Sequence, residues 1–329
     1  MIGRTFLSEE RSDVMSTRER ASNIFNVLTE QELEIFVYLF GDKHRECTEK
    51  VYQGETRIES LSAAFAQLGQ SCFMNGREPQ HQTVRESLCS YDNSILQLLR
   101  EEKEAKISGG LYNELQVRMT YNSNHIEGSR LTEDQTRLIF ETNTIDADEG
   151  ILVDDILETV HHFQAIDYVI DTAEDILTED IIKQLHFILK HDTKDSQISW
   201  FSVGDYKKRS NVVGGRETVK PKDVPVYMKR IIESYNSKSE VNINDIVDFH
   251  AEFEYIHPFQ DGNGRVGRLI ALKECLHHNI VPFIIEESKK EYYYRGLLEW
   301  KREKGWLTDT CLDGQDTFIR LLDMLDISH

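Results

Sequence analysis

Apolar positions recur at spacings of three and four residues along most of the chain, which predicts a succession of amphipathic helices. In the first third, residues 57–68 (RIESLSAAFAQL) follow this spacing. Thr29 and Glu32 form a capping box before an apolar run, a pattern typical of a helix start. We therefore expect residues 1–105 to form a helical arm, whose role the pattern does not reveal.

Further helices are predicted from Leu111 onward. The first of them should end at Gly128, a residue type favoured at helix C-termini, and Thr132 with Gln135 forms a capping box for the next. Later helices are marked by apolar stripes at helical spacing. These stripes are Leu152, Ile156, Val160 and Phe163; Ile181, Ile182, Leu185 and Leu189; and Met228, Ile231 and Ile232, after a start near Asp223.

Residues 202–221 (SVGDYKKRSNVVGGRETVKP) break the helical rhythm. A pair of valines precedes two glycines, and a second β-prone pair follows, which predicts a short β-hairpin. The residues concerned are Val212, Val213, Gly214, Gly215, Thr218 and Val219. Proline and glycine are otherwise scarce, so the fold class that we expect is all-α with one small hairpin.

A helix–loop–helix follows around the sequence HPFQDGNGR, residues 257–265. The first helix places Ile246, Phe249, Phe253 and Ile256 on one face, and Pro258 cannot continue it because proline lacks the backbone N–H. After the glycines, an apolar stripe resumes. Its members are Leu269, Leu272 and Leu276. The loop therefore lies where the second helix begins.

The residues of this loop are suited to binding a phosphate chain. A helix N-terminus carries free N–H groups and a partial positive charge, and glycines such as Gly262 and Gly264 let the backbone approach an anion. Arg265 and Arg268 lie one turn apart and can reach the same phosphates. Asp261 is a carboxylate of the kind that holds Mg²⁺ together with phosphate oxygens. The loop thus predicts a site for a nucleoside triphosphate.

His257 stands at the end of the preceding helix, where its imidazole can take a proton from a hydroxyl group. The surrounding chain is acidic, with a net charge of −20, so general binding of nucleic acid is not expected. Five cysteines are present without a CxxC pair, which indicates a reduced protein without a zinc site or a disulfide framework. No apolar leader or membrane-spanning run is evident, so we expect a cytoplasmic location.

The sequence HPFQDGNGRVGR resembles the signature of the Fic family, HPFx(D/E)GNGRxxR, and matches it at every specified position. The resemblance covers roughly residues 110–305. It implies an all-helical Fic fold and protein AMPylation, in which AMP moves from ATP to a Ser, Thr or Tyr hydroxyl of a protein. It divides the chain, after the arm, into an inhibitory segment (106–143), a Fic core (144–305) and a C-terminal helical tail (306–329).

The resemblance also implies a role for each residue of the signature. His257 would be the general base, and Asp261 would bind Mg²⁺ at the α- and β-phosphates. Gly262, Asn263 and Gly264 would form an anion hole. Arg265 would contact the phosphates, and Arg268 would contact the γ-phosphate.

The hairpin falls where the family carries a flap that holds the backbone of the target protein. We take Val212, Val213 and Gly214 as its edge on the nucleotide side. Farther on, Ser288 and Glu291 form a capping box for a tyrosine-rich helix that resembles the wall beside the nucleobase. There, Tyr293 is our candidate for a nucleotide contact, Lys301 is a further one, and Tyr294 and Trp300 are expected in the core.

The segment SNHIEG, residues 123–128, resembles the inhibitory motif of the family, (S/T)xxxE(G/N). Ser123, Glu127 and Gly128 occupy its defined positions. The resemblance implies that Glu127 pairs with Arg268 and so keeps this arginine from the γ-phosphate. A carboxylate near a phosphate site competes for the arginine and repels the incoming anion, which gives the same expectation from charge alone.

Alternatives to an autoinhibited transferase stay open. Glu127 could orient a water for removal of AMP, which would give a deAMPylase or a bifunctional enzyme. The chain could also be a regulatory module that senses ATP. Doc-type kinases of the family alter the loop glycines, which are intact here. The expected partners are ATP and a protein target, with no nucleic acid and no membrane, and a homo-oligomer is compatible with the sequence.

Overall fold

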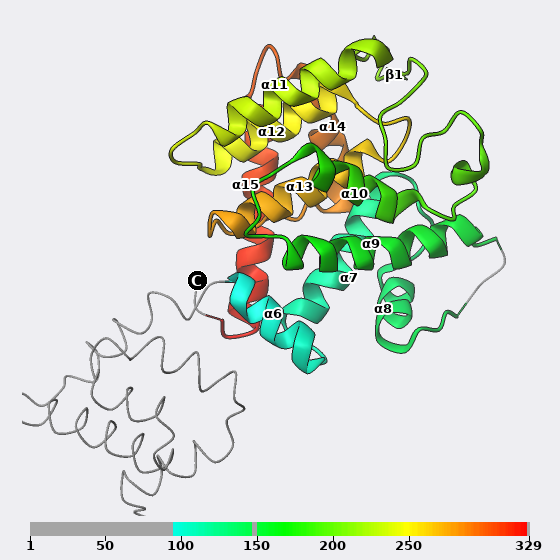
Figure 1. Ribbon diagram of the computed structural model, residues 1–329. Helices are drawn as coiled ribbons and strands as arrows, with labels where there is room; N and C mark the ends of the chain where they lie inside the picture. Colours follow the sequence, from blue (N-terminus) through cyan, green and yellow to red (C-terminus); the bar gives the residue numbers. More distant parts are fainter. Residues whose placement is uncertain (1–94, 147–149, 328–329) are drawn as a thin grey trace, which may run out of the picture. The chain divides into compact units, whose positions relative to one another are not determined.

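The computed structural model describes residues 95–146 and 150–327 (Figure 1). These residues form helices joined by loops, the longest of which (191–223) carries a small hairpin, so the all-α prediction is confirmed. The α-helices are α6 (Ile95–Ala105), α7 (Leu111–Ile126), α8 (Glu133–Thr142), α9 (Val153–Asp171), α10 (Glu179–Lys190), α11 (Val224–Asn236), α12 (Ile243–Ile256), α13 (Asn263–His277), α14 (Lys290–Glu299) and α15 (Gly305–Met324). Three short 3₁₀ turns are η2 (Asp195–Gln197), η3 (Pro221–Asp223) and η4 (Glu287–Lys289).

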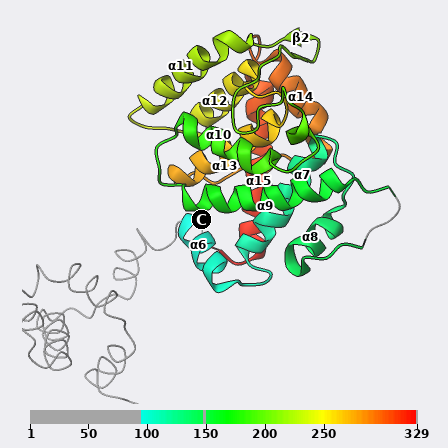
Figure 2. The ribbon, with the colours of Figure 1, turned by 45° about the vertical axis from the view of Figure 1, so that its right-hand side comes forward.

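Helix α13 lies in the middle of the described helices, with α7, α9, α10 and α12 packed against it (Figures 1 and 2). Every residue from Arg265 to Leu276 is buried, so the helix is enclosed on all sides rather than along one apolar stripe. Several of its polar side chains have hydrogen-bond partners. The ammonium of Lys273, for example, donates to the carbonyl oxygen of Asp175 at 2.5 Å and to Glu274 at 3.1 Å. The helix that begins at the candidate loop is therefore the rigid axis of the fold.

The two ends of the described chain also supply core residues. In α6, Leu96 and Leu99 are buried, and in α15 Leu307 and Phe318 are buried. The rest of the predicted arm, with the Thr29 and Glu32 capping box and residues 57–68, lies outside the described residues. None of the described helices is long and apolar enough to cross a membrane.

The end of α7 and the start of α8 agree with those predicted from the sequence. Gly128 has φ of +103°, a backbone conformation suited to glycine, just after α7 ends. The capping box of α8 is confirmed: the Thr132 hydroxyl accepts from the Gln135 N–H, and the Gln135 side chain accepts from the Thr132 N–H. In α9, by contrast, Leu152 precedes the helix and is 51% exposed, because at the N-cap it projects beyond the apolar stripe.

The predicted hairpin is present as β1 (Val212–Val213) and β2 (Arg216–Glu217). Val213 pairs with Arg216, and Gly214 and Gly215 form the two-residue turn with φ of +55° and +79°. We expected Thr218 and Val219 in the second strand, and this was wrong, because a two-residue turn pairs the residues that directly follow it.

The capping box predicted for α14 is also wrong. Ser288 lies inside η4, and the helix begins at Lys290 with no side chain bonded to its N-terminus. A residue within a 3₁₀ turn lacks the extended backbone that an N-cap needs, so the Ser288 hydroxyl cannot reach the N–H of Glu291.

Candidate active site

The loop between α12 and α13 is held in one conformation by its own side chains. His257 is the C-cap of α12 with φ of +53°, and its N–H donates to the Phe253 carbonyl oxygen at 2.8 Å. The buried Asn263 amide accepts from the Phe259 N–H at 2.8 Å and donates to the Phe259 carbonyl at 3.0 Å. Phe259 stacks on the ring of His186, with the ring centroids 4.0 Å apart. The loop therefore presents His257 at a fixed place.

The N-terminus of α13 is available to an anion. Gly262 is its N-cap with φ of +77°, and no side chain caps the helix. The first N–H groups of a helix have no partner within it and carry partial positive charge. The carboxylate of Glu127 lies directly against this turn, because a Cβ added to Gly264 would clash with it. An acidic group of the chain thus lies beside the helix start that suits a phosphate.

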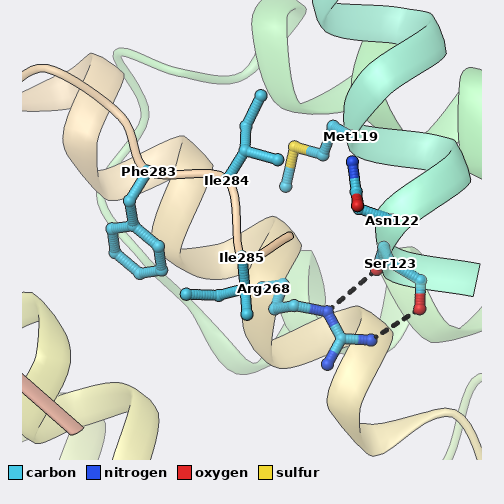
Figure 3. Close-up of a pocket in the computed structure, with 7 residues that line it drawn as sticks. All are labelled: Met119, Asn122, Ser123, Arg268, Phe283, Ile284 and Ile285. Carbon is cyan, nitrogen blue, oxygen red and sulfur yellow. Dashed lines mark hydrogen bonds between the residues drawn. The ribbon is translucent and has the colours of Figure 1, made fainter. Parts of the chain in front are cut away.

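Arg268 is held by the end of α7 (Figure 3). Its Nε donates to the Ser123 hydroxyl at 2.9 Å, and its Nη2 donates to the Ser123 carbonyl oxygen at 3.0 Å. The same Nη2 forms an ion pair of 2.7 Å with Glu127. The guanidinium is 4% exposed and the Glu127 side chain 29% exposed, so the pair is shielded from water on the arginine side. The expected contact of Ser123 and Glu127 with Arg268 is present.

His257 is in the neutral form that a general base needs. Burial lowers its pKa to about 4, and the charge of Lys207 acts in the same direction, against Glu127 and Asp261. The Nδ1 atom has no hydrogen-bond partner within the described residues and lies 3.8 Å from the Glu254 carboxylate. At neutral pH the imidazole can therefore accept a proton.

Asp261 belongs to a cluster of charged side chains around the buried Lys190 and Arg265. The ammonium of Lys190 contacts Asp261 at 2.8 Å, Glu158 at 2.6 Å and Asp195 at 2.9 Å. Arg265 contacts Glu158 at 2.5 Å and Asp261 at 3.3 Å. Burial raises the pKa of Asp261, but the two cations outweigh it and lower this pKa to about 2.

The Asp261 carboxylate suits the binding of a magnesium ion. It is ionised, its side chain is 52% exposed, and its contacts with Lys190 and Arg265 use the same oxygen, Oδ2. The described residues contain no cluster of three or more metal-binding side chains. This donor set fits Mg²⁺, which is commonly held by one or two carboxylates together with phosphate oxygens and water.

A cleft of about 600 Å³ connects these parts. It is bounded by the ends of α7 and α12, the first turns of α13, the hairpin and one face of α14. Its lining residues are Glu127, Val213, Gly214, Arg216, Glu254, Tyr255, His257, Gly264, Arg268, Glu291, Tyr293, Tyr294, Arg295, Leu297 and Leu298. The predicted base, the predicted brake, the second arginine and the hairpin thus face one space.

The tyrosine-rich helix differs from expectation in one respect. Tyr293 does line the cleft but is 1% exposed, and its hydroxyl contacts His250 Nε2 at 2.7 Å and Arg268 at 3.5 Å. Tyr294, expected in the core, is 41% exposed and donates to the Ile126 carbonyl at 3.1 Å. Adjacent helical positions point about 100° apart, so the two neighbouring rings meet different surroundings. Trp300 is buried as expected.

Lys301 is not brought into the cleft. Its ammonium forms an ion pair with Glu252 and lies 4.8 Å from the centre of the Tyr255 ring. It lines a separate groove between α11 and α12.

Three buried side chains of the site were not predicted: Lys190, Lys207 and Glu254. Lys190 and Glu254 had a signal in the sequence. Lys190 follows the apolar stripe of its helix directly, and Glu254 lies one helical turn before His257, so both fall next to the loop or the core. Lys207 lies in the segment without periodicity, and its position depends on contacts distant in sequence.

Residues 176–275 match the model of the Fic/DOC family. The chain carries a Fic domain. The matched range ends inside α13 and includes the hairpin, α12 and the whole loop. The family expected from the signature is thereby confirmed.

Curated relatives extend the similarity beyond the matched domain. The chain is 27% identical to "Protein adenylyltransferase Fic" of Aedes aegypti over 213 residues, covering 64% of this chain and 40% of that protein. It is 28% identical to the protein of the same name from Drosophila persimilis over 216 residues, covering 65% of this chain and 40% of the relative. The chain thus spans about 40% of the length of these curated relatives.

Solved structures show the same fold. A Fic-domain-containing signaling protein from Bacteroides thetaiotaomicron aligns with a TM-score of 0.55 and 24% identity, covering 70% of this chain and 94% of the other. Fic-1 from C. elegans aligns with a TM-score of 0.55 and 17% identity, covering 98% and 97%. The helical arrangement around α13 is therefore the Fic fold.

Proposed function

We propose that the chain is an autoinhibited protein adenylyltransferase, which moves AMP from ATP to a Ser, Thr or Tyr hydroxyl of a protein, including its own. The observation that carries this proposal is the arrangement of His257 and Arg268 in one cleft, with Glu127 bound to the arginine. The names of the curated relatives support the same reaction.

In the proposed reaction, the neutral imidazole of His257 takes the proton of the target hydroxyl. The hydroxyl oxygen then forms a bond to the α-phosphorus of ATP, and the bond from this phosphorus to the pyrophosphate oxygen breaks. AMP remains on the target and pyrophosphate leaves. Little covalent help is required from the protein, so positioning and neutralisation of charge account for most of the catalysis.

The start of α13 and its two arginines would bind the phosphates. Gly262, Asn263 and Gly264 would offer backbone N–H groups as the anion hole, as at other helix N-termini. Arg265 would contact the phosphates from its buried position. Arg268 would bind the γ-phosphate once this arginine is released from Glu127. Asp261 would hold Mg²⁺, which when bound neutralises charge on the phosphates.

Glu127 is the proposed brake. It takes the Nη2 donor of Arg268 and puts a negative charge against the first turn of α13. Both effects oppose an incoming triphosphate, since one removes a partner and the other adds repulsion. Ser123 holds the other side of the guanidinium, and the turn at Gly128 ends the helix that carries both residues.

The hairpin supports a role in holding the target. The side chains of Val212 and Val213 are 62% and 41% exposed, at an edge that continues into the cleft through Gly214. A short exposed strand can pair with an extended segment of another protein and so place one hydroxyl near His257.

The test is intact mass measurement after incubation with ATP and Mg²⁺. The parent should gain little AMP, Glu127→Gly should gain AMP readily, and the double variant with His257→Ala should lose this gain by ~10²–10⁴-fold. Glu133→Gly, at a partly exposed glutamate in α8, is the matched control. Equal labelling by Glu127→Gly and the parent would remove the brake assignment. ATP binding by calorimetry without transfer from any variant would favour a module that senses ATP.

A second function, removal of AMP, is supported by the position of Glu127 in the same cleft as His257. There the carboxylate would orient a water towards the phosphorus of a modified side chain. With an AMP-modified target, Glu127→Gly should then lose the release of AMP while it gains transfer. Release that persists in Glu127→Gly would exclude this role.

A further inference from the structure

Lys207 is a buried lysine between the hairpin and the loop of His257. It is 3% exposed, and its backbone N–H donates to the Pro258 carbonyl at 2.9 Å. No ion pair among the described residues includes it. Its ammonium instead lies within hydrogen-bond distance of four neutral oxygens. These belong to Thr218 (Oγ1, 2.6 Å), His257 (carbonyl, 2.7 Å), Asn211 (Oδ1, 2.9 Å) and Ile256 (carbonyl, 3.4 Å).

Two of these oxygens belong to the base of the hairpin. Asn211 directly precedes β1, and Thr218 directly follows β2. The Thr218 N–H donates to the Asn211 carbonyl at 3.3 Å, which closes the base, and the Asn211 amide donates to the Phe259 carbonyl at 3.3 Å. The ammonium of Lys207 therefore holds both ends of the hairpin at once.

The other two oxygens are carbonyls at the C-terminal end of α12. This end of a helix carries partial negative charge, which stabilises a cation there. Burial, together with the charge of Arg216, lowers the pKa of Lys207 to about 8, so most of the ammonium is charged at neutral pH. One buried cation thus joins the hairpin to the last carbonyls before the loop.

The same cation affects the imidazole of His257. Charged groups face this ring from several elements: Lys207 and Arg216 from the hairpin segment, Glu254 from α12, Glu127 from α7 and Asp261 from the loop. The two basic residues disfavour the imidazolium, whereas Glu127 and Asp261 favour it. The Lys207 ammonium donates to the backbone carbonyl of His257 itself and disfavours the imidazolium more than Arg216 does.

We propose that Lys207 is a positioning residue, which fastens the hairpin to the loop and holds the backbone of His257 in place. The effect of Lys207 on catalysis rests on the proposed function. The fastening and the titration of His257 do not depend on it and can be measured without any transfer of AMP.

The test is an NMR titration of the His257 ring, assigned by comparison with His257→Ala. Lys207→Met removes the charge and should raise the pKa of His257 by about one pH unit, the usual spread of histidine pKa values among protein sites. Lys208→Met, at the exposed neighbouring lysine, should leave it unchanged. An equal titration of His257 in Lys207→Met and Lys208→Met would contradict an ammonium of Lys207 held at the backbone of His257.

Amide hydrogen exchange tests the fastening. Protection of the Thr218 N–H should fall in Lys207→Met and stay as in the parent in Lys208→Met. Thr218→Val, which keeps the Lys207 charge, should lower protection of the neighbouring hairpin amides without moving the His257 titration. Unchanged protection in both variants would overturn the fastening. If Lys207→Met does not fold, Lys207→Gln replaces it, because the amide keeps a donor but carries no charge.

Transfer of AMP adds a separate readout in the Glu127→Gly background. Lys207→Met should lower kcat for transfer by roughly tenfold or more, within the range for a disturbed general base, and leave the KM for ATP near its parent value. If Glu127→Gly transfers no AMP at all, the proposed function fails while the NMR and exchange results still decide the role of Lys207.

Discussion

At the scale of single residues, Glu254 is a buried acid without a cation of its own. Burial raises its pKa to about 8, the charge of Glu127 adds to this, and Arg268 opposes it. Its Oε1 has no hydrogen-bond partner within the described residues, and its Oε2 lies 3.8 Å from His257. At neutral pH the carboxyl is therefore mostly protonated in the folded chain and ionised in the unfolded chain.

The stability of the protein should depend on pH through this residue. The unfolded chain releases the Glu254 proton above the ordinary value of 4.5, but the folded chain releases it only above about 8. The contribution of Glu254 to stability is therefore present below pH 4.5 and is lost as the pH rises to about 8. Glu254→Gln cannot ionise, so its unfolding temperature relative to the parent should rise across this window.

Thermal unfolding at several pH values measures this difference. Glu252→Gln, two residues earlier on α12 and in an ion pair with Lys301, is the control and should show no such rise. If the unfolding temperatures of the parent and Glu254→Gln change in parallel between pH 4.5 and 8, the protonated state assigned to Glu254 is wrong.

At the scale of elements, α7 is part of the core rather than a detachable lid. Leu111, Leu115 and Met119 on this helix are buried in the main apolar cluster. Only its last turns meet the site, and these are held from the other side: the Asn122 side chain accepts from the Glu287 N–H, and Tyr294 donates to the Ile126 carbonyl. Release of Arg268 should therefore need a local change at the end of α7 and not departure of the helix.

Tyr294→Phe tests this local release. It removes one hydrogen bond to the end of α7, and such a bond contributes about 0.5–1.5 kcal/mol, so basal AMP labelling should rise roughly 2–10-fold. The increase should stay below that of Glu127→Gly, because the ion pair with Arg268 remains. Tyr292→Phe, at an exposed tyrosine of the same helix, is the control for the rate of mass gain. Labelling no faster than in this control would show that Tyr294 does not restrain α7.

At the scale of the whole molecule, local signals in the sequence were sufficient for the helices and the loop. Proline cannot continue a helix, so Pro258 stops α12, and Gly262 at positive φ precedes α13. The hairpin turn needs only Gly214 and Gly215. Lys207 could not be predicted in this way, because its partners at His257 and Thr218 come together only in the folded chain.

The positions of the charged side chains show the same limit of prediction from local sequence. Lys301 was our candidate, yet it pairs with Glu252 outside the cleft, whereas Lys190 is buried among three carboxylates. A local pattern tells that a lysine lies on a helix, but not which acids other helices bring to it. The net charge of −20 likewise gave no hint that the site gathers its cations around α13.

Ligand binding should be visible in the stability of the whole chain. A ligand that binds only the folded state stabilises it, by about 2.7 kcal/mol at a concentration one hundred times Kd. For a unit of this size, such a gain raises the unfolding temperature by roughly 5–10 °C. ATP with Mg²⁺ should therefore raise the unfolding temperature of Glu127→Gly more than that of the parent, in which Arg268 is already engaged.

The part of this shift that depends on magnesium should require Asp261. In the Glu127→Gly background, Asp261→Asn should keep the shift seen with ATP and EDTA but lose the further rise on adding Mg²⁺, because the ionised oxygen is gone. Asp195→Asn is a close control, since Asp195 and Asp261 contact the Lys190 ammonium at 2.9 and 2.8 Å. Loss of the Mg²⁺ increment in Asp261→Asn alone would separate metal binding from the general loss of a charge beside Lys190. The same increment in both variants would place the metal elsewhere.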